Sequence, residues 1–112
     1  MINDYINFVE ELCEVLEQKA FASQHGQYSK EKKTTYFWFK INKKYTKIIQ
    51  TNYGSDSVHA FINNENLDLL KAAAWNLPAK GARYNLAKDF DRILEVCDHH
   101  GSYLYNRKKV LV

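Results

Sequence analysis

The spacing of apolar residues changes between residues 22 and 34, and this change restricts the fold more than any other feature. Over residues 2–22 apolar side chains recur every three or four positions, which predicts an amphipathic helix with an acidic opposite side. Over residues 34–62 β-branched and aromatic residues are frequent, and over 45–53 the side chains alternate between two faces, as is typical of strands. The sequence therefore predicts an α+β protein.

Three strands are expected in the middle of the chain. Residues 34–41 and 45–53 are separated by a polar turn, and residues 57–62 follow a turn at Gly54. On the first strand, Phe37, Phe39 and Ile41 are expected to face the core. Tyr36 and Trp38 then either point outward or lie under the N-terminal helix, because alternate side chains lie on opposite faces of a sheet.

Residues 67–75 allow two interpretations. Their Leu, Lys and Ala residues favour a helix, which would give a competing fold with a helix over 64–76. The short polar turn that follows the third strand favours a fourth strand instead. We take the second interpretation, with the sheet ending near residue 73.

The remainder of the chain is expected to close the sheet. Pro78 and Gly81 indicate an irregular, basic loop over 74–85. A second helix is predicted over 86–99, with Asn85 as its N-cap and Gly101 after its end, and a short strand over 103–107. Residues 1–112 are thus one domain, an antiparallel four-stranded sheet (34–73) flanked by an N-terminal and a C-terminal helix. The expected core includes Leu12, Phe37, Phe39, Ile41 and Leu94.

Two motifs resemble those of a known family. Residues 57–85 contain Ser-Val-His-x-Phe and then Lys-x-Ala-x-Trp-x-x-Pro-Ala-Lys-Gly-x-Arg-x-Asn, and residues 101–105 contain Gly-x-Tyr-Leu-Tyr. This pattern resembles a small family of phage- and prophage-encoded proteins. The resemblance implies a viral or prophage origin, a strand at 67–73, and no enzymatic activity. The chain departs from the family where Asn66-Leu67-Asp68 replaces a turn that often ends in Gly-Asp. The matching residues are Ser57, Val58, His59, Phe61, Lys71, Ala73, Trp75, Pro78, Ala79, Lys80, Gly81, Arg83, Asn85, Gly101, Tyr103, Leu104 and Tyr105.

Charge is distributed unevenly. Residues 1–22 carry five acidic side chains and one lysine, a net charge of −4, whereas the whole chain carries +3. The other ninety residues therefore carry +7, which favours an anionic partner for one surface.

The basic loop is the leading candidate site. A backbone that leads into a helix N-terminus favours anions, Gly81 permits close approach, Lys80 and Arg83 add positive charge, and two aromatic rings can stack on a base. The spacing differs from that of a P-loop. The predicted ligand-binding residues are Trp75, Lys80, Gly81, Arg83, Tyr84 and Asn85. A secondary basic surface is predicted at Lys43, Lys44 and Lys47, where lysines alternate with aromatic residues.

Other chemistry has little support in the sequence. Cys97, His99 and His100 are too close together at a helix end to form a typical zinc site, and no nucleophile motif is present. Cys13 and Cys97 are expected as buried thiols. We expect no cofactor, no metal, no catalytic residue and no membrane contact, and a cytoplasmic location, in the host cell if the protein is viral.

Two functions are consistent with these features. The first is a non-enzymatic phage accessory protein that binds a nucleic acid or nucleotide through the basic loop. The second is an inhibitor of a host enzyme or defence system that binds it through the acidic helix residues Glu10, Glu14 and Glu17. An exposed aromatic face is also compatible with a homodimer.

Overall fold

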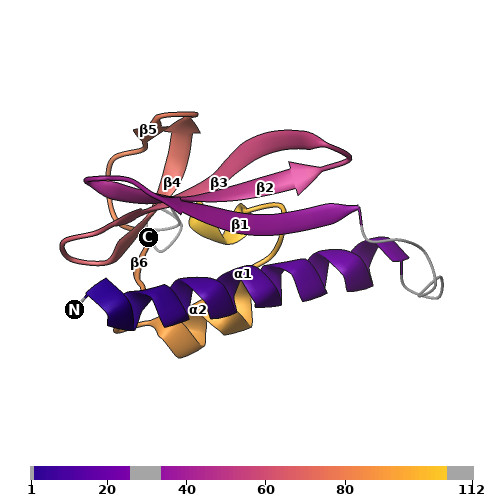
Figure 1. Cartoon of the computed structure of the whole chain (residues 1–112). Coiled ribbons are helices and arrows are strands. Elements are labelled where there is room, and N and C mark those ends of the chain that lie inside the picture. The colour runs from indigo at the N-terminus through magenta and orange to yellow at the C-terminus, as the bar shows by residue number, and fades with distance from the viewer. Residues whose placement is uncertain (1, 26–33, 106–112) are drawn as a thin grey trace, which may run out of the picture.

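The computed structural model describes residues 2–25 and 34–105 and has α+β architecture. Helix α1 (Ile2–His25) lies along one face of a curved antiparallel sheet, and the shorter helix α2 (Phe90–Val96) lies beside it (Figure 1). Helix α1 is three residues longer than predicted, because Ser23, Gln24 and His25 also belong to it.

Within the described residues the sheet has six strands rather than four. Four consecutive strands, β1 (Thr35–Ile41), β2 (Tyr45–Asn52), β3 (Ser55–Asn63) and β4 (Asp68–Ala74), pair in chain order. Residues 67–73 thus contribute a strand, as expected, and the competing helix over 64–76 is wrong. The two additional strands, β5 (Leu77–Pro78) and β6 (Tyr84–Asn85), both pair with β4.

The predicted loop at 74–85 is therefore more regular than expected. The chain turns back along β4, where the Ala79 amide donates to the Lys71 carbonyl (2.7 Å) and the Arg83 amide donates to the Leu69 carbonyl (2.8 Å). These bonds satisfy main-chain groups of β4 that would otherwise lie at the edge of the sheet.

The predicted helix over 86–99 is shorter, and its cap is different. The side chain of Asn85 accepts hydrogen bonds from the amides of Ala87 and Lys88, so the chain forms a turn there and the helix begins only at Phe90. The residue before the helix is Asp89, which instead accepts from the Asn85 amide (2.8 Å). The predicted strand over 103–107 is also wrong: Ser102–Leu104 forms a 3-10 helix, η1, and residues 106 and 107 lie outside the described part.

The main core lies between α1 and the sheet. Leu12 and Phe37 are buried there as expected, and Phe39 and Leu94 pack against it, but Ile41 is exposed near the end of the edge strand. The helix contributes a continuous buried stripe, which is the packing that makes most of a helix stable in a protein. That stripe consists of Tyr5, Val9, Leu12, Cys13, Leu16 and Ala20.

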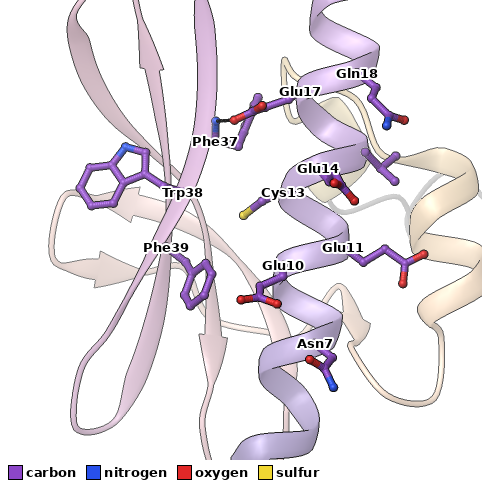
Figure 2. Close-up of a pocket in the computed structure, with 11 residues that line it drawn as sticks. Asn7, Glu10, Glu11, Cys13, Glu14, Glu17, Gln18, Phe37, Trp38 and Phe39 are labelled. Atoms are coloured by element: carbon purple, nitrogen blue, oxygen red, sulfur yellow. Dashed lines mark hydrogen bonds between the residues drawn. The ribbon is translucent and has the colours of Figure 1, made fainter.

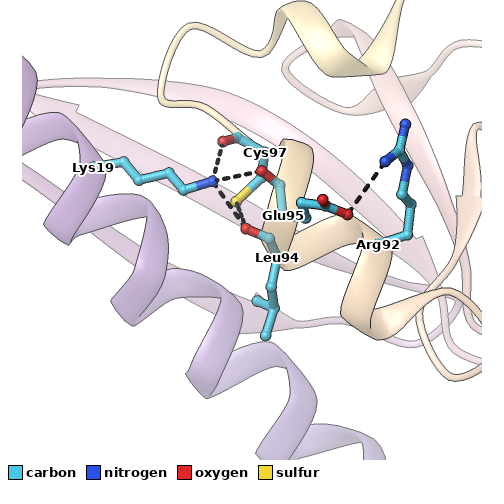
Figure 3. Close-up of polar contacts among 5 residues, drawn as sticks. All are labelled: Lys19, Arg92, Leu94, Glu95 and Cys97. Carbon is cyan, nitrogen blue, oxygen red and sulfur yellow. Dashed lines mark hydrogen bonds and ion pairs between the residues drawn. The ribbon is translucent and has the colours of Figure 1, made fainter.

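A lysine of α1 holds the end of α2 (Figure 3). The ammonium of Lys19 donates to the carbonyls of Leu94 (2.9 Å), Glu95 (3.3 Å) and Cys97 (2.7 Å). The last carbonyls of a helix have no partner within the helix, and a cation there is also favoured by the helix dipole. Lys19 therefore fixes α2 relative to α1, although α2 has no basic residue in its own last turn.

The C-terminal segment is attached to the sheet by a buried polar pair. His59 Nε2 and the Tyr103 hydroxyl lie 2.7 Å apart, and both side chains are buried. Gly101 adopts φ 80° directly beside the His59 ring, where a Cβ atom would be 3.7 Å from the imidazole. Burial lowers the pKa of His59 to about 4, against the smaller opposing effect of Asp98, and His99 lowers it further.

The turn at Asn66-Leu67-Asp68 places a residue other than glycine in the left-handed backbone region. Leu67 has φ 68°, a conformation that glycine adopts at no cost. Its amide donates to the Asn63 carbonyl (2.7 Å), and its side chain packs against the core, which offsets the strain.

We expect Tyr53→Asn to stabilise the protein by about 1 kcal/mol. Tyr53 and Gly54 form the two-residue turn between β2 and β3, with φ 52° and 82°, a type I′ turn that favours Asn-Gly. The Tyr53 side chain is 75% exposed, so little packing is lost. Urea denaturation would measure the change, with Tyr53→Ala as the control that removes the ring but keeps the strain. A variant no more stable than that control would contradict the expectation.

We also expect the free energy of unfolding to fall as the pH decreases from 6.5 to 4. In this range protons bind His59 in the unfolded chain, where its pKa is about 6.5, but not in the folded protein, where it is about 4. The loss amounts to roughly 3 kcal/mol at pH 4, and the stabilisation is fully present above pH 6.5. In the double variant His59→Phe/Tyr103→Phe, which removes both partners, the free energy of unfolding should depend less steeply on pH across this range. An unchanged dependence in that variant would contradict the assignment to His59.

Candidate functional site

The predicted loop residues do not form one binding surface. Arg83 is used inside the protein: its Nε donates to the Leu104 carbonyl (2.6 Å) and its Nη1 donates to the carbonyls of Lys80 and Gly81. Gly81 has φ 90°, and a Cβ atom there would lie 3.3 Å from the Arg83 guanidinium. The glycine therefore permits this internal contact, and Lys80 alone of these three presents an exposed side chain.

Tyr84 and Asn85 are likewise part of the fold. The ring of Tyr84 packs near Tyr103, with centroids 6.2 Å apart. The side-chain Nδ2 of Asn85 donates to the Asn66 carbonyl (2.8 Å) and to the Asp68 carboxylate (3.1 Å), which joins β6 to the turn before β4. Both residues stabilise the region around β4 and are only partly accessible.

Trp75 lies on the sheet face opposite α1. Lys47 of β2 pairs with Phe61 of β3 and belongs to that face, and its ammonium lies 4.4 Å from the centre of the Trp75 ring. The same ammonium donates to Asn76 Oδ1 (2.7 Å). Burial and the neighbouring charge of Lys40 lower the pKa of Lys47. Lys47 is therefore buried beneath the indole, whereas Trp75 itself remains 47% exposed.

The open face of the sheet carries exposed aromatic rings beside lysines. We use the term open face for Tyr36, Trp38 and Lys40 of β1, Tyr45, Lys47 and Thr51 of β2, Asp56 and Phe61 of β3, and Trp75. Tyr36 is 46% exposed and Trp38 is 42% exposed, and α1 covers neither of them. Lys40, Lys43 and Lys44 are exposed at the β1–β2 end of this face. Sequence reasoning left open which face α1 would cover, and the structure decides this.

A hydrogen-bond chain fixes the Trp38 ring. Its Nε1 donates to Thr51 Oγ1 (2.9 Å), and the Thr51 hydroxyl donates to Asp56 Oδ1 (2.6 Å). A ring held in one orientation loses less conformational entropy when it stacks on a ligand. Asp56 also places a negative charge at this edge, so the basic part of the open face lies toward Lys40.

The predicted acidic residues border a groove between α1 and β1 (Figure 2). The groove has a volume of about 820 Å³ and is lined by Glu10, Glu11, Glu14 and Glu17 together with Phe37 and Phe39. Glu17 is already engaged, because its Oε2 accepts a hydrogen bond from the Phe37 amide (2.8 Å). Burial, with the charges of Glu17 and Glu10, raises the pKa of Cys13 in this groove to about 12, so its thiol is not a nucleophile at neutral pH.

Other candidate chemistry is not assembled in the described part of the chain. No group of three or more His, Cys, Asp and Glu side chains there is suited to hold a metal ion. The rings of His99 and His100 lie with centroids 3.9 Å apart and planes tilted by 39°, and Asp98 accepts from the Gly101 amide (2.7 Å). Cys13 and Cys97 are buried free thiols, as expected. None of the described helices is long and apolar enough to cross a bilayer.

Sequence reasoning missed the roles of Thr51, Asn76 and the β1 edge. Thr51 accepts a hydrogen bond from a residue 13 positions away and Asn76 accepts one from a residue 29 positions away, and no local pattern indicates such contacts. The alternation of β1 did indicate that Tyr36 and Trp38 share a face, which is the signal that leads to the open face.

The family model that matches the chain covers residues 2–106 and carries the description "Family of unknown function (DUF7717)". No curated protein and no solved structure matches the sequence. Because the match includes both helices and every strand of the sheet, the chain belongs to the DUF7717 family.

Proposed function

We propose that the protein binds single-stranded nucleic acid on the open face, without catalysing a reaction. The observation that carries the proposal is the exposure of Tyr36, Trp38 and Trp75 on the sheet face that α1 leaves uncovered. Exposed aromatic rings on a sheet stack with bases, and this contact tolerates any base because each has a π face.

The lysines supply the second requirement for such a ligand. Lys40, Lys43 and Lys44 are exposed beside the aromatic rings and can pair with phosphates. Lys47, in contrast, supports the Trp75 ring from beneath. Relative to the sequence-based hypothesis, the ligand class is kept and the site moves from the basic loop to the open face, with Trp75 common to both.

The biological setting follows from the resemblance noted above. We propose a phage or prophage origin, hence action in the cytoplasm of a host cell, and a role as an accessory protein. The alternative function, inhibition of a host enzyme through Glu10, Glu14 and Glu17, has its own support in the acidic groove beside β1.

We expect Trp38→Ala to weaken binding of a fluorescein-labelled dT12 oligonucleotide by about tenfold, because one stacked base contributes about 1–3 kcal/mol. Trp38→Phe should retain most of the affinity, since an aromatic face remains. Tyr105→Ala is the matched control, because Tyr105 is exposed but contacts Lys71 rather than the open face. Fluorescence anisotropy in 50 mM salt measures all four proteins. Equal affinities of Trp38→Ala and Tyr105→Ala would refute the open face as the site.

A separate prediction concerns the exposed lysines beside the open face. A Lys40→Gln/Lys43→Gln/Lys44→Gln variant should bind dT12 with a salt dependence reduced by about 2 in the slope of log K against log salt, since each phosphate contact to a single strand contributes about 0.7. Lys80→Ala should leave both affinity and slope unchanged. If Lys80→Ala instead removes binding, the ligand lies on the basic loop and not on the open face.

A further inference from the structure

The outer edge of β1 carries main-chain groups that do not pair with β2. In an antiparallel ladder, successive residues direct their N–H and C=O groups alternately toward the partner strand and away from it. Main-chain bonds join Tyr53 to Thr34 (3.0 Å) and Asn42 to Tyr45 (2.9 Å), so even-numbered residues of β1 face β2. Phe37, Phe39 and Ile41 therefore direct their main-chain groups to the outer edge of the sheet, because β1 is its first strand.

The groove between α1 and β1 lies along this edge. One outward amide, that of Phe37, donates to Glu17 Oε2 (2.8 Å). For the outward amide and carbonyl of Phe39, two residues further on, residues 2–25 and 34–105 provide no hydrogen-bond partner. Figure 2 shows the Phe39 ring directed toward α1 and the Trp38 indole directed away from it. The edge thus offers the main-chain groups to which another strand can pair.

The charge of the groove selects what can enter. Its lining contains four glutamates and no lysine or arginine. Glu10 and Glu17 both point toward β1, and their positions seven residues apart correspond to about 10 Å along the helix, or roughly three residues of an extended strand (Figure 2). Burial raises the pKa of the Cys13 thiol most, and the charges of Glu17 and Glu10 raise it further, so the negative potential of these carboxylates extends into the groove.

We propose that an extended, basic segment of a partner protein binds in this groove, adding a strand to the edge of β1. Main-chain bonds to Phe39 provide affinity, and Lys or Arg side chains at alternate positions of the segment face Glu10 and the other glutamates that line the groove. A second copy of this chain fits less well, because its own β1 would bring another row of glutamates to the same edge. This inference does not depend on nucleic-acid binding at the open face.

The test uses the full-length protein labelled with ¹⁵N and the peptide acetyl-Lys-Val-Lys-Val-Lys-Val-amide. We expect the peptide to shift the amide resonances of Phe39 and Ile41. The protein variant Glu10→Gln/Glu14→Gln should bind at least fivefold more weakly than the unaltered protein. The control Glu65→Gln/Glu95→Gln, which removes the same charge from exposed sites elsewhere, should bind normally.

Two altered peptides separate pairing of the main chain from attraction of charge. Glutamate in place of each lysine should abolish binding, and N-methylation of alternate amides should abolish it while the charge stays the same. If the N-methylated peptide binds equally well, or if the β1 amides do not shift, the proposal is wrong. Sedimentation that shows a dimer of the free protein with the β1 amides protected from exchange would also overturn it, because a second copy would then occupy the edge.

Discussion

The structure depends on one packing constraint: a single long helix covers a sheet that has two faces. Helix α1 packs on one face with buried residues such as Val9, Leu12 and Leu16. On the other face, the sheet must be shielded by its own side chains and by the turn after β4. Trp75 and Asn76 therefore fold over Lys47, whose ammonium lies 4.4 Å from the centre of the Trp75 ring and 6.0 Å from that of Phe61. Exposed rings on this face are what remains when no second layer of structure covers it.

The sequence determined the parts of this arrangement that depend on periodicity. The helix stripe, the alternation of β1 and the turn at Gly54 were predictable, because each arises from contacts within a few residues. The start of α2 was not predictable. Asn85 is a residue type that often caps helices, but its side chain closes a turn with Ala87 and Lys88, before the helix begins at Phe90. Strands β5 and β6 contain two residues each and exist only because β4 offers them free main-chain groups, which no local signal reveals.

The roles of the residues in the predicted basic loop could not be predicted from the sequence either, for a different reason. Lys80, Gly81 and Arg83 have the residue types of an anion-binding loop, but three carbonyl groups occupy the Arg83 guanidinium. An arginine can satisfy backbone carbonyls as well as phosphates, and the choice depends on which segment folds against it. Here the C-terminal segment binds Nε through the Leu104 carbonyl, and the loop itself binds Nη1 through the carbonyls of Lys80 and Gly81. The C-terminal segment is held additionally by His59 through Tyr103 and by Lys71, whose ammonium lies 4.8 Å from the Tyr105 ring. His59 and Arg83 of the motif at 57–85 therefore hold the motif at 101–105 in place.

The position of α1 also separates two surfaces of opposite charge. The glutamates of α1 border one side of β1, whereas Lys40, on the same strand, belongs to the open face. The Debye length at physiological salt is about 8 Å, which is comparable with the thickness of one layer of secondary structure. Charges on the two sides are consequently screened from each other, although the strand between them is shared. Because Glu17 holds the Phe37 amide from one side and Thr51 holds the Trp38 indole from the other, adjacent residues of β1 are fixed independently. The strand can thus present an acidic edge and a basic, aromatic face without either weakening the other.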